Sequence, residues 1–173
     1  MGDLGNININ QALKFILAGN SEFVLYSTKT NGKFEYKMTK KNSRDKEDSY
    51  IYFLNTKIDG EYMYAGVILI DEITQEFKFG QGKNGQVPGN HLNIRSLLFV
   101  LNKLNSGGIP QYCEVFHTGT CGRCGKKLTT PESILTGLGP ECSKKVGVPR
   151  VKIKKQKAYD DNKVLWVKLQ KTV

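Results

Sequence analysis

The sequence has no apolar run long enough to cross a membrane. A membrane-spanning helix needs about 18 or more consecutive apolar residues, whereas the best apolar run here extends only from Ala65 to Ile70. The first residues also lack the basic-then-apolar pattern of a secretory signal peptide. We therefore expect a cytoplasmic protein that does not interact with membranes.

Cysteine and histidine are scarce, with four cysteines and two histidines in 173 residues. Three of the cysteines have metal-ligand spacing, which fits a reducing cytosol better than a disulfide framework. The chain also lacks the His-Glu-x-x-His motif of zinc peptidases and the His-x-Glu and Pro-Cys-x-x-Cys motifs of zinc deaminases. Gly125 follows the Cys-x-x-Cys motif, where a c-type haem site needs a histidine. These absences favour a protein that is not an enzyme.

The metal-binding residue types that are present lie close together in the sequence. His117, Cys121 and Cys124 form a His-x3-Cys-x2-Cys pattern, and Cys142 follows after 17 intervening residues. One imidazole and three thiolates are the Cys₃His ligand set of a closed structural zinc site, which leaves no open position for water. Cys113 is left over; it is either a small buried strand residue or a substitute ligand. The pattern predicts one bound Zn²⁺ ion.

The residues between the second and third metal-spaced cysteines predict a short helix. Thr130 is suited to cap its first turn, and Pro131 is suited to that turn because its missing N–H is not needed there. Gly137 then ends the helix. Pro140 restarts the chain, so that Cys142 points back toward the metal.

This stretch resembles a small zinc module found in many bacteriophage and bacterial proteins. The resemblance rests on Cys-Gly-Arg-Cys-Gly-Lys-Lys-Leu-Thr-Thr-Pro-Glu-Ser-Ile followed by Gly-Leu-Gly-Pro-Glu-Cys, and it covers His117 to about Lys145. It implies a zinc ion and a phage protein that acts inside an infected bacterial cell. It implies no reaction, because the family has no assigned function.

Positive charge is concentrated in the last third of the chain. Residues 1–116 hold 13 Lys and Arg against 12 Asp and Glu, whereas residues 117–173 hold 13 against 4, a net of +9. Such segregation is typical of a surface that binds a polyanion, although a solvated basic surface is the alternative. Lys40 and Lys41, in the balanced part, are expected to contribute little. The predicted nucleic-acid-binding residues are Arg123, Lys126, Lys127, Lys144, Lys145, Arg150, Lys152, Lys154, Lys155, Lys157 and, as a base-stacking platform or a core anchor, Trp166.

Alternating apolar and polar residues predict a sheet before the cysteines. Asn31-Gly32 and Asp59-Gly60 separate such runs and are typical of hairpin turns. Apolar residues at helical spacing predict helices at 9–17 and 94–104. The predicted fold is α+β, with a meandering antiparallel sheet, two packed helices, a small zinc-knuckle module and a basic C-terminal hairpin. The predicted strands are 22–28, 33–39, 50–57, 61–70, 74–79 and 111–116, and the predicted domains are 1–112, 113–149 and 150–173.

The hairpin at 50–70 is apolar on both faces. Tyr52 and Tyr64 belong to it. A strand that is covered on both faces has this pattern, and so does a strand that presents aromatic rings to stacked bases. Burial is the commoner cause, so these tyrosines are secondary candidates.

The sequence favours a zinc-containing, phage-type nucleic-acid-binding protein that is not an enzyme, with single-stranded DNA as the preferred ligand. One alternative is a phage protein that binds and modulates a host protein complex, such as a polymerase or a defence system. A third hypothesis is a metal-dependent nuclease, because His91 lies between Asn90 and Asn93 in a pattern seen in some nucleases.

Overall fold

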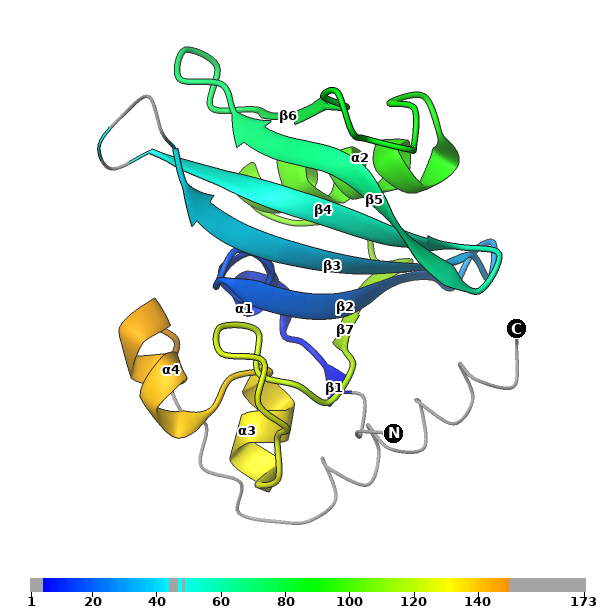
Figure 1. The fold of residues 1–173 in the computed structure, drawn as a ribbon. Helices are drawn as coiled ribbons and strands as arrows, with labels where there is room; N and C mark the ends of the chain where they lie inside the picture. Colours follow the sequence, from blue (N-terminus) through cyan, green and yellow to red (C-terminus); the bar gives the residue numbers. More distant parts are fainter. Residues whose placement is uncertain (1–4, 44–46, 48, 150–173) are drawn as a thin grey trace.

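Seven strands form one antiparallel sheet in the order β1-β7-β2-β3-β4-β5-β6 (Figure 1). The structure is a computed structural model that describes residues 5–43, 47 and 49–149. The predicted α+β fold with a meandering antiparallel sheet is confirmed. The strands are β1 (Gly5–Asn6), β2 (Asn20–Ser27), β3 (Lys33–Asn42), β4 (Tyr50–Ile58), β5 (Glu61–Ile70), β6 (Phe77–Gly80) and β7 (Cys113–His117), and the helices are α1 (Ile9–Ile16), α2 (Leu92–Asn105), α3 (Pro131–Thr136) and α4 (Pro140–Val146).

The two predicted hairpins form where the turn residues tolerate a left-handed backbone. Asn31, between β2 and β3, has a φ of 57°. Between β4 and β5, Asp59 and Gly60 have φ values of 51° and 84°. Two consecutive residues with positive φ match the twist of a tight hairpin, and Asn, Asp and Gly adopt this conformation at the lowest cost. Local backbone chemistry therefore fixes the register of both hairpins.

The strand predicted at 74–79 begins later, at Phe77, because Asp71 organises a turn before it. One oxygen of the Asp71 carboxylate accepts the backbone N–H groups of Ile73 and Thr74, each at 2.9 Å. The hydrogen bonds from Thr74 and Ile73 also lower the pKa of this exposed carboxyl. Gln75 completes the turn with a φ of 60°. An aspartate that caps its own backbone in this way competes with strand pairing.

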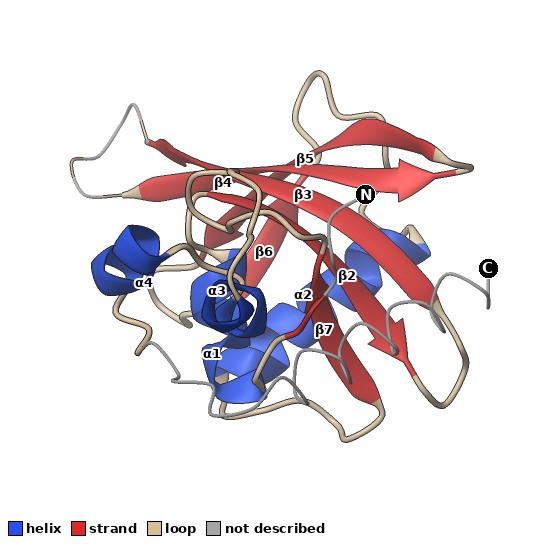
Figure 2. Cartoon of the chain, turned by 90° about the horizontal axis from the view of Figure 1, so that it is seen from below, coloured by secondary structure: helices blue, strands red, loops and turns tan. Residues whose placement is uncertain are grey.

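Helix α2 carries the chain back across the sheet, so that β7 pairs with β2 rather than with β6. Both long helices lie on one side of the sheet (Figure 2), as the sequence predicted for two packed helices. The Tyr36 hydroxyl, buried beneath α2, donates to the Asn93 carbonyl at 2.7 Å. Phe15 and Ile16 of α1 are also fully buried. The core therefore lies between the sheet and the helices.

Residues 118–149, which we call the cysteine module, follow β7 and contain α3 and α4. Backbone hydrogen bonds attach the module to the sheet: Asn20 N–H donates to the Gly122 carbonyl at 2.8 Å. Strand β7, which begins at Cys113, pairs with β2 as part of the main sheet. No helix among the described residues is both long and apolar enough to span a bilayer. The predicted C-terminal hairpin at 150–173 lies outside the described residues.

Candidate metal centre

Three cysteines of the cysteine module lie together. The sulfur atoms of Cys121, Cys124 and Cys142 are all within 4.8 Å of one another. Zn–S bonds of about 2.3 Å in a tetrahedral site separate neighbouring sulfur atoms by about 3.8 Å. The spacing of the three sulfurs is therefore close to that in the coordination sphere of one zinc ion. These three thiols can therefore hold one metal ion, such as Zn²⁺.

A tight turn brings Cys121 and Cys124 together. Cys121 N–H donates to the Lys126 carbonyl at 2.8 Å, and Gly125 N–H donates to the Cys121 carbonyl at 2.9 Å. Gly125 has a φ of 75°, which favours glycine because it has no Cβ. The Cys-Gly-Arg-Cys-Gly sequence thus builds a turn that directs both thiols to one side.

The third cysteine is delivered by two short helices. The Thr130 hydroxyl accepts the Ser133 N–H at the start of α3, and Pro131 occupies the first turn. Gly137 ends α3 with a φ of 73°. Pro140 then begins α4, which places Cys142 in its first turn. The start and the end of α3 are the ones that the sequence predicted, whereas for the residues from Pro140 it predicted a restart of the chain and no helix.

Backbone hydrogen bonds to sulfur favour the metal-binding thiolate form of Cys121. Burial opposes ionisation of Cys121, but backbone N–H groups of Cys124, Gly139 and Arg123 hold the pKa of this thiol below its usual value. Burial raises the pKa of Cys142, and the Arg123 guanidinium, 3.9 Å from its sulfur, acts in the opposite direction. Because thiolates rather than thiols bind metal, this donor set fits a metal ion.

The structure places His117, the predicted fourth ligand, away from the three thiols. The group of ligand atoms within 4.8 Å of one another does not include it. Its Nδ1 accepts the Gly119 N–H at 2.9 Å, and its Nε2 lies 2.5 Å from the Ile134 carbonyl oxygen. The Gly119 N–H can only donate a hydrogen bond, and the Ile134 carbonyl oxygen can only accept one. The buried ring is therefore neutral, with its proton on Nε2. Both nitrogens thus connect β7 to the cysteine module, whereas the sequence predicted that β7 delivers His117 to the metal.

We expect His117→Gln to keep the metal and to lose stability. The substitution disturbs two buried hydrogen bonds, and each buried partner left without its bond costs about 1–3 kcal/mol. Metal analysis and thermal unfolding of the purified variant measure the two effects separately. Loss of the metal, to the extent seen on removal of a cysteine, would show that His117 is a ligand.

Two other candidate site residues, Cys113 and His91, lie outside the cysteine cluster. Cys113 lies at the start of β7 and is not part of the cysteine cluster. His91, the nuclease candidate, is the N-cap of α2, where its Nδ1 accepts the Asn93 N–H at 3.2 Å. The Asn93 side chain donates to the Thr56 hydroxyl at 2.9 Å. His91 and Asn93 therefore serve the fold, and neither is near the thiols.

The two tyrosines considered for base stacking differ in exposure. Tyr52 is 5% exposed and faces the helices, so its ring is not available as a platform. Tyr64 lies half-buried on the opposite face, where its ring centroid is 6.2 Å from that of Phe53. That face also holds Tyr62, with the Lys37 ammonium 4.1 Å from its ring centroid. Burial explains one of the two tyrosines, and the stacking hypothesis applies only to the other.

Asn20, which no motif in the sequence indicates, holds the Cys-x-x-Cys turn against β2. Its side-chain amide donates to the Arg123 carbonyl at 3.2 Å. The contact joins residues 103 positions apart in the chain, so no local pattern indicates it. The predicted cations of the module are at its surface: Lys126, Lys127, Lys144 and Lys145 are exposed and Arg123 is half-buried. The remaining predicted contacts, Arg150, Lys152, Lys154, Lys155, Lys157 and Trp166, lie outside the described residues.

Residues 114–147 match a protein family of unknown function (DUF6011). The match contains all three clustered cysteines and agrees with the resemblance to an uncharacterised module. It covers less than half of the chain and carries no assigned activity. No curated protein and no solved structure matches the chain.

Proposed function

We propose that this chain is a zinc-containing, non-enzymatic protein that binds nucleic acid, preferably single-stranded DNA, through the surface of its cysteine module. The observation that carries the proposal is the clustering of three thiols in a module whose lysines are exposed. Zn²⁺ held by Cys121, Cys124 and Cys142 would fix the turn and helix α4, from which the basic side chains project. The ion would be structural: it would supply folding free energy to the module.

The charges of the cysteine module support a polyanionic ligand. Its four lysines are exposed, and its two acidic residues, Glu132 and Glu141, do not balance them. Lys144 lies 3.5 Å from Glu141, but both side chains are more than 70% exposed. Such a surface pair contributes little and leaves the lysine available to phosphate. Phe53 and Tyr64, the half-buried aromatic pair on the face of the sheet opposite the helices, are a second feature suited to a single strand. Unpaired bases can stack on such aromatic rings.

Binding to a mixed-sequence oligonucleotide should weaken steeply as salt is raised. Each phosphate neutralised on a single strand contributes about −0.7 to the slope of log K against log salt, so five contacts predict a slope of roughly −3.5. Lys126→Gln with Lys127→Gln should flatten the slope by about 1.4. Fluorescence anisotropy with single- and double-stranded DNA and RNA measures affinity and strand preference together.

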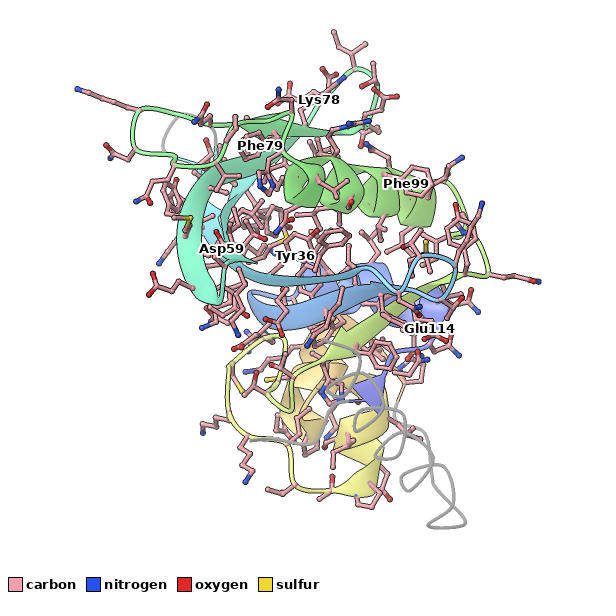
Figure 3. All side chains as sticks on the ribbon, turned by 90° about the vertical axis from the view of Figure 1, so that its right-hand side faces the viewer. Tyr36, Asp59, Lys78, Phe79, Phe99 and Glu114 are labelled. Atoms are coloured by element: carbon pink, nitrogen blue, oxygen red, sulfur yellow. The ribbon has the colours of Figure 1, made fainter. Side chains whose placement is uncertain are left out.

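The matched control is Lys78→Gln with Lys103→Gln, which removes the same charge from β6 and α2. Figure 3 shows Lys78 at the opposite end of the molecule from the cysteine module. This control should leave affinity within about twofold, because screened charges beyond about 10 Å act weakly at 0.1 M salt. Absence of binding to every oligonucleotide at about 50 mM salt would exclude the proposal and favour an acidic protein as the partner.

A further inference from the structure

The cysteine module and the sheet enclose a groove of about 580 Å³ in which basic side chains from four parts of the chain meet. Lys14 comes from α1, Lys40 from β3, Arg123 from the cysteine turn and Lys145 from α4. None of the described residues that line this basic groove is acidic. We propose that the basic groove binds backbone phosphates of a single-stranded nucleic acid, an inference that rests on the proposed function.

Contacts on both sides of the groove hold its cations in place. The Lys14 ammonium donates to the Gly147 carbonyl at 3.2 Å, which joins α1 to the end of α4. The Lys40 ammonium lies 3.9 Å from the centroid of the exposed Tyr50 ring. The Arg123 guanidinium lies 3.9 Å from the Cys142 sulfur. Three of the four positive groups, those of Lys14, Lys40 and Arg123, are therefore already positioned, which lowers the entropy cost of binding an anion.

Within the part of the chain that the structure describes, no carboxylate pairs with a cation of the basic groove. On the open face of the sheet, by contrast, Glu35 lies 3.0 Å from Lys57 and 3.4 Å from Lys33, and Glu22 lies 4.0 Å from Lys37. The ion pairs found among the described residues include none of the four groove cations. Four like charges around one hollow repel one another, and a phosphate relieves this repulsion.

The shape and lining of the groove favour one strand over two. Its volume lies within the range of about 300–1,000 Å³ that is typical of small-molecule sites, which suits a nucleotide unit. A double helix is a stiff cylinder, and its body does not enter a hollow of this size. Leu13, Leu17 and Val146 supply apolar contact for a sugar or a base. Arg123 can donate two parallel hydrogen bonds to one phosphate, which lysine does not do.

Lys14→Gln with Lys40→Gln tests the proposal, because both lysines lie outside the cysteine module and in the balanced part of the sequence. Anisotropy with a mixed-sequence single-stranded oligonucleotide should show affinity reduced roughly tenfold or more at about 50 mM salt and a salt slope flattened by about 1.4. Bound oligonucleotide should also protect Lys14 and Lys40 of the native protein from acetylation, and it should leave Lys78 reactive. The single variant Lys40→Gln keeps the Lys14–Gly147 hydrogen bond and should show about half the change in slope.

The control variant Lys78→Gln with Lys103→Gln has the same net charge as the groove variant and should bind like the native protein. If the native chain binds and the groove variant matches this control, the groove proposal is wrong while the proposed function stands. If the native chain binds no nucleic acid at low salt, both are wrong. Metal content and the unfolding temperature of each variant confirm that the fold is intact.

Discussion

Replacement of Cys142 by alanine should release the metal and unfold the cysteine module while the sheet stays folded. Helices α3 and α4 contain only six and seven residues, and isolated helices of this length do not persist in water. The apolar residues buried within the module are few: Leu128, Ile134, Leu138 and Val148. We therefore expect metal binding to provide folding free energy, which amounts to about 10–16 kcal/mol for structural zinc in small peptides.

Three measurements on the Cys142→Ala variant check this expectation. Metal content should fall from about one equivalent to near zero, trypsin should cut the chain at the module's lysines, and the β-sheet signal in circular dichroism should remain. Cys113→Ala is the matched control, because Cys113 lies outside the cluster, and it should keep full metal content. A Cys142→Ala protein that retains its metal would refute the three-cysteine site.

Phe15→Ala should be the most destabilising single change in the sheet–module interface. Phe15 is fully buried on α1, and its ring fills the space beside two glycines of the module. A Cβ on Gly122 would lie 2.5 Å from the Phe15 ring, and a Cβ on Gly137 would lie 2.7 Å from it. Removal of such a ring costs about 3–5 kcal/mol, because it forfeits burial and leaves a cavity.

Denaturant unfolding of Phe15→Ala measures this loss, and Phe99→Ala provides the comparison with the same residue type. Phe99 of α2 is 43% exposed and lies on the surface (Figure 3). Its removal should cost clearly less than that of Phe15, since a large part of its area stays in contact with water in the folded chain. Equal losses for the two variants would show that Phe15 does not anchor the module.

The sequence alone predicted the features that depend on neighbouring residues. Asn31-Gly32 and Asp59-Gly60 were sufficient to locate two hairpins, because a positive φ is a property of the turn residues themselves. Thr130 and Pro131 likewise located the start of α3, since a helix cap involves residues only two or three positions apart. The Cys-x-x-Cys spacing and the later cysteine were enough to predict that three thiols meet.

Tertiary structure decided the surroundings of side chains for which the sequence left two possibilities. His117 has the spacing of a metal ligand, yet its nitrogens contact Gly119 and Ile134. Which partner a histidine takes depends on the distance between segments after folding, and spacing in the sequence does not contain that distance. Tyr52 is similar: alternation placed it on one face of β4, but only the position of the helices decided that this face is buried.

The composition of the basic groove was decided entirely by tertiary structure. Counting charges along the chain located the excess in residues 117–173 and led to the expectation that Lys40 contributes little. The return of the chain through α2 and β7 brings the cysteine module against α1 and β3, so that Lys14 and Lys40 lie beside Arg123. Charge segregation in the sequence reports the net charge of a segment, whereas the electrostatic potential at a surface depends on the distances between charges. The distances between these charges are fixed only once the strands have paired in their native order.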